Sequence, residues 1–188
     1  MSIETANGKA VGTATATRPV EFTLNGRAVV GLADESIIET AKRYGVEVPH
    51  LCYKAGLRAD GNCRACMVEI KGERALAPSC CRFPKADMEV TTDSARAVAS
   101  QKMVLELLLS DIPERAYTPN SELDLWARKL SVGKPRFEAR HQPTQDLSHA
   151  AIAVNLDACI QCTRCMRACR EEQVNDVIGY AFRGEHSK

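Results

Sequence analysis

Short apolar runs separated by polar turns occupy the early part of the chain and predict a small sheet. Residues 20–32 (VEFTLNGRAVVGL) hold two strand-like runs rich in Val, Phe, Leu and Thr, with Asn25-Gly26 between them. An Asn-Gly pair between two such runs is the strongest short signal for a β-hairpin, because both residues tolerate positive φ. We therefore predict a β-hairpin here.

A helical period follows the hairpin. Residues 33–49 carry apolar side chains at helical spacing, namely Ile37, Ile38, Ala41 and Tyr44. Asp34 or Ser36 is suited to cap the start of this helix, and Gly45 to end it. One amphipathic helix is predicted.

Three later runs have the composition of short strands, at residues 67–72, 74–80 and 88–92. They can complete a small mixed sheet with the hairpin. The order of hairpin, helix, loop and returning strands is that of a β-grasp domain. We predict an α+β fold with this domain at residues 18–95.

An amphipathic helix is predicted at residues 95–111. Its inner face is predicted to carry Val98, Met103, Val104, Leu107 and Leu108. Residues 112–150 contain four prolines and few apolar clusters, which predicts an irregular connector with one short helix around residues 122–130. Trp126 in that helix is predicted to be a packing anchor. The predicted parts are a disordered tail at 1–17, the β-grasp domain at 18–95, helix and connector at 96–150, and a C-terminal segment at 151–188.

Composition and charge exclude several classes of function. The hydrophobic share of 45% is that of a globular protein, and the formal net charge is +1. Such a balance creates no overall field for nucleic acid or an anionic membrane. No run is apolar and long enough for a signal peptide or a membrane span. We expect a soluble, cytoplasmic chain, in which an odd number of cysteines indicates metal ligation instead of a disulfide framework.

The cysteines fall into two groups with a long cysteine-free stretch between them. The first group is Cys52, Cys63, Cys66, Cys80 and Cys81, and the second is Cys159, Cys162, Cys165 and Cys169. We predict two separate metal sites joined by the connector.

The first group is predicted to bind a [2Fe-2S] cluster. The expected ligands are Cys52, Cys63, Cys66 and Cys80, three of them from one long loop and the fourth from beyond a strand. Small and turn-forming residues in the loop let backbone N–H groups approach the cluster, where hydrogen bonds tune its reduction potential. Cys81 is predicted to be a bystander, because it points away from Cys80 if that backbone is extended.

Other uses of these thiols are less well matched. Structural zinc sites usually take two short Cys-x2-4-Cys knuckles, and only one is present here. A thioredoxin-like dithiol opens a helix, whereas Cys66 opens a predicted strand. The Cys-x4-Cys-x2-Cys spacing of plant ferredoxins is absent.

The second group, Cys159-x2-Cys162-x2-Cys165-x3-Cys169, has the spacing of a bacterial [4Fe-4S] run. In such a run the first three thiolates bind one cluster and the fourth reaches a different one. Cys169 is predicted to start a helix at residues 170–179 and to face away from the first cluster. The proline usual after the fourth cysteine is replaced by Arg170.

No catalytic residue is predicted, since the sequence offers no recognisable nucleophile, acid–base pair or substrate pocket. The histidines are assigned ordinary structural or surface roles. They are His50, His141, His149 and His186.

Residues 48–72, with APSC at 77–80 and MVLELLLSD at 103–111, resemble an N-terminal iron–sulfur region shared by three families. These are the large iron–sulfur subunit of respiratory NADH:quinone oxidoreductase, the small subunits of NAD-linked hydrogenases and the large subunits of NAD-dependent formate dehydrogenases. Residues 154–187 are most similar to the last of these. The resemblance covers about residues 20–185.

The resemblance to formate dehydrogenase implies an electron relay. In that family a longer chain continues into a second cysteine run and a molybdenum or tungsten pterin domain that oxidises formate. Electrons pass through the clusters to a flavin partner, a diaphorase-type subunit, that reduces NAD. The chain is then either a fragment or a short standalone relative.

Many relatives bind a further [4Fe-4S] cluster through a His-x3-Cys-x2-Cys-x5-Cys segment. Residues 112–134 contain no cysteine, so this cluster is expected to be absent. The module of a hydrogenase or quinone reductase remains an alternative. A rival from another class is a zinc-stabilised interaction module that uses the same cysteines.

Overall fold

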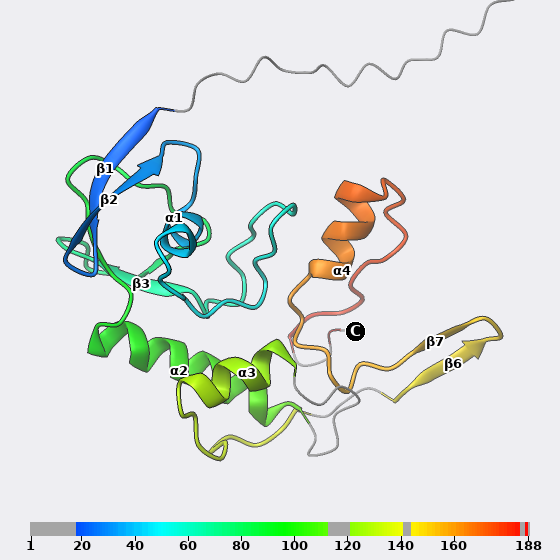
Figure 1. The fold of residues 1–188 in the computed structure, drawn as a ribbon. Helices are drawn as coiled ribbons and strands as arrows, with labels where there is room; N and C mark the ends of the chain where they lie inside the picture. Colours follow the sequence, from blue (N-terminus) through cyan, green and yellow to red (C-terminus); the bar gives the residue numbers. More distant parts are fainter. Residues whose placement is uncertain (1–17, 113–120, 141–143, 185–186, 188) are drawn as a thin grey trace, which may run out of the picture.

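The computed structural model describes residues 18–112, 121–140, 144–184 and 187. Five short strands form one sheet in the order β2-β1-β5-β3-β4 (Figure 1). The strands are β1 (Pro19–Leu24), β2 (Arg27–Leu32), β3 (Met67–Ile70), β4 (Ala77–Pro78) and β5 (Glu89–Thr91). β1 pairs in parallel with β5, and the other pairs are antiparallel. The predicted small mixed sheet is confirmed.

The β1–β2 turn has the geometry that its sequence predicts. Asn25 and Gly26 have φ of 49° and 76°, the two positive values of a turn whose twist matches that of the strands. The Asn25 side chain also bonds Thr92 at the far end of β5: its amide donates to the Thr92 hydroxyl, and its oxygen accepts from the Thr92 N–H, both at 2.8 Å. The hairpin is therefore anchored to the sheet as well as turned locally.

Helix α1 (Ile37–Arg43) packs its apolar face against the sheet. Ser36 is its N-cap residue, and the Glu39 carboxylate accepts the Ser36 backbone N–H at 2.8 Å, as in a capping box. Gly45 follows the helix with φ of 73°. The predicted helix and its two ends are confirmed, and its Ile37, Ile38 and Ala41 lie in the main core with strand residues such as Val68.

Helix α2 (Ala95–Ser110) and helix α3 (Glu122–Lys129) build a second, smaller core beneath the cysteine loop (Figure 1). Leu51 and Ala65, which flank ligand cysteines of the first group, are buried there. Trp126 is partly buried against the same core, as predicted.

The inner face predicted for α2 is partly wrong. The buried residues are Ala97, Gln101, Leu105 and Glu106, while Met103 and Leu107 are exposed. Gln101 is buried because its amide donates to the Met67 and Thr92 carbonyls at 2.9 and 3.0 Å. The buried face of α2 is therefore centred on a polar side chain that hydrogen-bonds carbonyl groups at the ends of two strands. A pattern of apolar residues does not reveal such a position.

The C-terminal part differs from expectation in two places. Strands β6 (Asp146–His149) and β7 (Ile152–Val154) form a hairpin that was not predicted, and every side chain in the two strands is exposed. The helix predicted at residues 170–179 is wrong, since helix α4 (Arg164–Arg167) continues as the π-helix η1 (Ala168–Glu172). Positive φ at Val174 and Asp176 ends it.

Within the described ranges, no helix is both long and apolar enough to cross a membrane.

Candidate iron–sulfur centres

The four predicted [2Fe-2S] ligands lie together in the loop between α1 and β3 and in the turn after β4. Cys52, Cys66 and Cys80 are almost fully buried, and Cys63 is partly buried. Cys63 and Cys80 are hydrogen-bonded to Cys52, and Cys80 is also hydrogen-bonded to Cys66. The structure thus brings all four thiols into one contact cluster.

Shared protons set the acidity of these thiols. Hydrogen bonds from Cys63, which have the larger effect, and from Cys80 lower the pKa of Cys52 to about 2. A hydrogen bond from Cys80 lowers the pKa of Cys66 to about 7. The pKa values of Cys63 and Cys80 are raised because they donate these bonds. The hydrogen bonds therefore favour the thiolate of Cys52, and iron binding would release the protons that the ligand thiols still hold.

Backbone N–H groups also point at the sulfur atoms. The Cys52 N–H donates to Cys63 Sγ at 3.4 Å, and the N–H groups of Asn62 and Cys63 donate to the Cys52 thiol. Left-handed φ values of 62° at Gly61 and 59° at Arg64 turn the loop so that these groups face inward. Such bonds stabilise thiolates and tune the potential of a bound cluster.

This donor set fits a [2Fe-2S] cluster. Four thiols linked by hydrogen bonds, three of them almost fully buried, and met by backbone donors are the ligands that this cluster takes. Among the described residues, no group of three or more His, Cys, Asp or Glu side chains is placed to hold a single metal ion. A two-iron cluster takes two cysteines at each iron, so it does not need such a group.

Cys81 does not point away from Cys80 as expected. The Cys81 N–H donates to the Pro78 carbonyl at 3.0 Å, so the backbone turns here and is not extended. The two sulfur atoms lie 3.6 Å apart. Cys80 is the thiol that bonds both Cys52 and Cys66, which favours Cys80 as the ligand of the pair.

The second group is held by an unusual backbone. Gln161 and Thr163, which lie in the two spacers, have positive φ of 53° and 62°. The pKa of the Tyr180 hydroxyl is raised to about 12. Burial is the main cause, and the charges of Cys159, Cys162 and Cys165 add to it. Tyr180 therefore lies within electrostatic reach of these three cysteines.

Cys165 and Cys169 lie four positions apart on the continuous helical segment formed by α4 and η1. Cys165 is exposed, whereas Cys169 is buried. Cys169 thus lies inside the helical segment and does not precede it. Its assignment to the same cluster or to a second one stays a prediction.

The histidines that the structure describes have ordinary contacts. His50 bonds the Val48 carbonyl through Nδ1 at 2.8 Å, and its ring meets those of Tyr53 and Trp126 edge-on at 5.7 Å. His149 lies in the exposed β6–β7 hairpin, where its Nδ1 accepts the Ala151 N–H at 3.1 Å. His141 and His186 lie outside the described residues.

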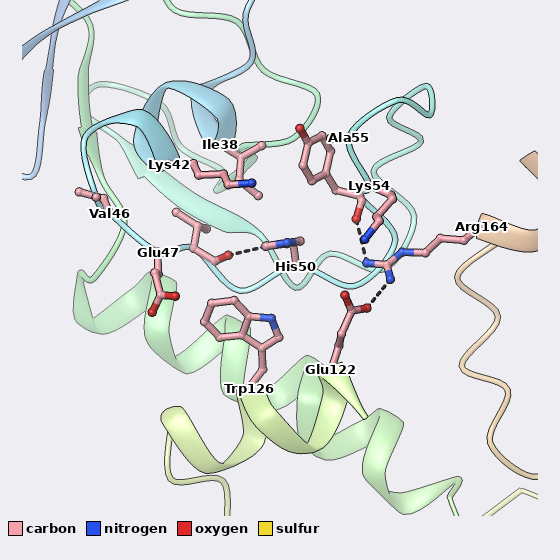
Figure 2. A pocket seen from close by; sticks show the side chains of 13 residues that line it. Ile38, Lys42, Val46, Glu47, His50, Lys54, Ala55, Glu122, Trp126 and Arg164 are labelled. Carbon is pink, nitrogen blue, oxygen red and sulfur yellow. Dashed lines mark hydrogen bonds and ion pairs between the residues drawn. The ribbon is translucent and has the colours of Figure 1, made fainter. Parts of the chain in front are cut away.

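A cavity of about 380 Å³ lies beside His50 and Trp126, between α1 and α3. Figure 2 shows the side chains that line it. The Arg164–Glu122 ion pair closes one side of it. Its wall mixes apolar side chains with charges of both signs and contains no cysteine.

Comparison with known proteins agrees with this site. Residues 17–95 match the family described as a 2Fe-2S iron-sulfur cluster binding domain. The chain is 32% identical over 175 residues to an NADP-reducing hydrogenase subunit, HndD, of Solidesulfovibrio fructosivorans, covering 87% of this chain and 30% of that protein. It is 29% identical over 172 residues to a subunit of the NADH-quinone oxidoreductase of Rickettsia prowazekii, and the match covers 89% of this chain and 26% of that protein.

A further relative is the mitochondrial NADH-ubiquinone oxidoreductase 78 kDa subunit of Candida albicans, 31% identical over 167 residues, with 85% of this chain and 22% of that protein covered. The chain thus spans 30% or less of the length of these relatives.

A solved structure shares the fold. It is a chain of an NAD+-reducing [NiFe]-hydrogenase in the H2-reduced state, with a TM-score of 0.77, 24% identity, and 89% of this chain and 73% of that chain covered. Residues 17–95 thus match a 2Fe-2S iron-sulfur cluster binding domain, and the chain is similar in sequence to subunits of an NADH-quinone oxidoreductase and of an NADP-reducing hydrogenase.

Proposed function

We propose that this chain is the iron–sulfur electron-transfer module of an NAD-dependent formate dehydrogenase. It relays electrons between a molybdenum or tungsten pterin centre that oxidises formate and a flavin-containing partner subunit that reduces NAD. The β-grasp domain carries a [2Fe-2S] cluster on Cys52, Cys63, Cys66 and Cys80. The C-terminal segment carries a [4Fe-4S] cluster on Cys159, Cys162 and Cys165, with Cys169 as its fourth ligand or as the ligand of a second cluster.

The observation that carries this proposal is the contact cluster of four thiols, three of them buried, at residues 52–80. Bound clusters of both kinds exchange single electrons at potentials set by hydrogen bonds and burial. The protein's own contribution is to hold the ligands, to direct backbone N–H groups at the sulfur atoms and to exclude water from three of the four thiols.

A second observation is that the two cysteine groups adjoin, although the chain between them is long. The Asn62 amide, in the first cysteine loop, donates to the Gln161 carbonyl of the second group at 3.4 Å. Ile160 packs against the core that contains Leu51 and Ala65. Two redox sites on neighbouring loops are the arrangement that a relay requires.

The choice of formate as electron source comes from the likeness of residues 154–187 to formate dehydrogenase subunits. The equivalent module of an NAD-linked hydrogenase or an NADH:quinone oxidoreductase is the alternative, which the relatives' names favour. Formate, H2 and NADH can each be added anaerobically to the complex purified from its native source. Bleaching of the visible absorption by formate is expected, and bleaching by H2 alone would assign the chain to a hydrogenase.

The cluster assignment is tested by Cys63→Ser in the anaerobically purified chain. The variant is expected to lose a rhombic [2Fe-2S] EPR signal, and its domain at residues 18–95 is expected to be less stable than that of the wild type. Cys81→Ala is the matched control, since it removes a neighbouring thiol and is expected to keep iron and sulfide content. Persistence of the signal in Cys63→Ser would refute the ligand set, and a colourless chain that contains zinc would favour the interaction module.

A further inference from the structure

Arg167, on α4, carries a buried charge between the two cysteine groups. It is only 3% exposed, although it lies on the polar C-terminal segment. A buried guanidinium is destabilising unless it is paired and its donors are satisfied. The position of its partners therefore shows what the charge is used for.

The partners of Arg167 come from both cysteine groups. One terminal nitrogen, Nη2, donates to the carbonyl of Cys52 and, at 3.3 Å, to the carbonyl of Cys162. The other, Nη1, donates to the carbonyl of Arg58 in the first cysteine loop. A single planar side chain thus joins the backbone of a predicted [2Fe-2S] ligand to that of a predicted [4Fe-4S] ligand.

The remaining donor holds the side chain in place. Arg167 Nε lies 3.1 Å from the Thr163 hydroxyl and 3.2 Å from the Asp60 carboxylate. The Thr163 hydroxyl in turn lies 3.2 Å from the Asp60 carboxylate. The first cysteine loop and the spacer between Cys162 and Cys165 therefore share one polar network. Because a guanidinium presents its donors in a fixed fork, it sets the relative orientation of the groups that it bonds.

We propose that Arg167 is a positioning residue that fixes the [2Fe-2S] and [4Fe-4S] sites relative to each other through the Cys52 and Cys162 carbonyls. This inference rests on the proposed function for the second cluster. Its positive charge also favours the reduced, more negative form of both clusters, so that it raises their reduction potentials.

Other contacts across the same boundary do not involve the Arg167 side chain and remain available when it is changed. The Arg58 N–H donates to the Glu171 carboxylate at 3.1 Å, and Arg164 donates to the Tyr53 carbonyl at 2.8 Å. Figure 1 shows α4 standing beside the tip of the first cysteine loop. These bonds tie α4 to the loop, but none of them links a ligand of one group to a ligand of the other.

The experiment uses the chain purified anaerobically and reconstituted with iron and sulfide, so that both clusters are loaded, then reduced with dithionite and examined by EPR. In the wild type the two reduced clusters are expected to split or broaden each other's signals, because magnetic dipoles interact at short range. Arg167→Met is expected to keep both cluster signals, to lose this splitting and to lower both midpoint potentials. Arg170→Met is the matched control for the geometric readout: Arg170 lies on the same helical segment, pairs with Asp176 at 2.9 Å, and its substitution is expected to leave the splitting unchanged.

Arg167→Lys separates charge from geometry. A lysine restores the positive charge but is a point charge without the planar fork, so the potentials are expected to return toward wild-type values while the splitting stays reduced. An unchanged splitting in both Arg167→Met and Arg167→Lys would overturn the proposal. If Arg167→Met does not fold, Arg167→Lys alone decides by the same criterion.

The inference and the proposed function fail in different ways. A wild-type chain that holds only the [2Fe-2S] signal contradicts the proposed second cluster. The positioning role is then read from amide hydrogen exchange of residues 52–62, which is expected to become faster in Arg167→Met and not in Arg170→Met. Equal exchange in the two variants would overturn the role of Arg167.

Discussion

Replacement of Leu105 by alanine tests whether the second core supports the cysteine loop. Leu105 lies on α2, is 0% exposed and packs in the core that includes Leu51 and Ala65. Leu51 precedes Cys52 in the chain, and Ala65 precedes Cys66. A cavity at Leu105 therefore lies directly beneath the backbone that presents these two ligands.

The expected cost follows from the complete burial of this side chain. Truncating a buried leucine to alanine removes its transfer free energy and leaves a cavity, together about 2–5 kcal/mol. A loss of about 3 kcal/mol increases the population of open states about 100-fold. With a urea slope of about 1–3 kcal/mol per molar, the unfolding midpoint is expected to fall by about 1–3 M.

The assay follows far-UV circular dichroism and visible absorption of the cluster-loaded chain in urea under anaerobic conditions. The two signals are expected to shift together, since the loop and the second core share residues. Leu107→Ala is the matched control: Leu107 lies on the same helix but is 45% exposed, and its truncation is expected to cost less than about 0.5 kcal/mol. Equal effects of the two substitutions, or an unchanged visible midpoint in Leu105→Ala, would refute the coupling.

Two further predictions concern the loops themselves. Gly61→Ala is expected to lower the iron content of the chain and to reduce its free energy of unfolding by at least about 1–2 kcal/mol, because φ is 62° and the new Cβ would lie 2.8 Å from Cys81 Sγ. The double variant with Cys81→Ala should recover part of this loss. A wild-type iron content in Gly61→Ala would contradict the loop geometry. Counting ligands predicts that the chain alone holds its C-terminal cluster as a labile or three-iron form, and that an extension through a second cysteine run restores two stable [4Fe-4S] clusters. A full, stable cluster in the short chain that Cys169→Ser destroys would instead make Cys169 the fourth ligand.

Local signals in the sequence were sufficient for much of the 2Fe-2S domain. The hairpin at Asn25-Gly26 and the ends of α1 at Ser36 and Gly45 depend on the conformations that single residues tolerate, so neighbours in the chain determine them. The spacing of the first four cysteines likewise predicted a ligand set that the structure brings into contact.

The sequence patterns failed where a distant contact decides the local arrangement. Gln101 is buried on α2 because it bonds carbonyls at Met67 and Thr92, which no helical period of apolar residues encodes. Cys81 lies beside Cys80 because the chain turns after β4, whereas the prediction assumed an extended strand.

The sequence by itself determined which residues have the chemistry to bind iron, and tertiary structure alone decided how the two groups face each other. No sequence pattern marks Arg167, which lies between Cys165 and Cys169, yet it is buried against the Cys52 carbonyl, 115 positions away. Hydrogen bonds of this kind require the first cysteine loop to lie beside α4, which is a property of the tertiary structure. The physical reason is that conformational preference acts between neighbours in sequence, whereas burial of a charge depends on every element packed around it.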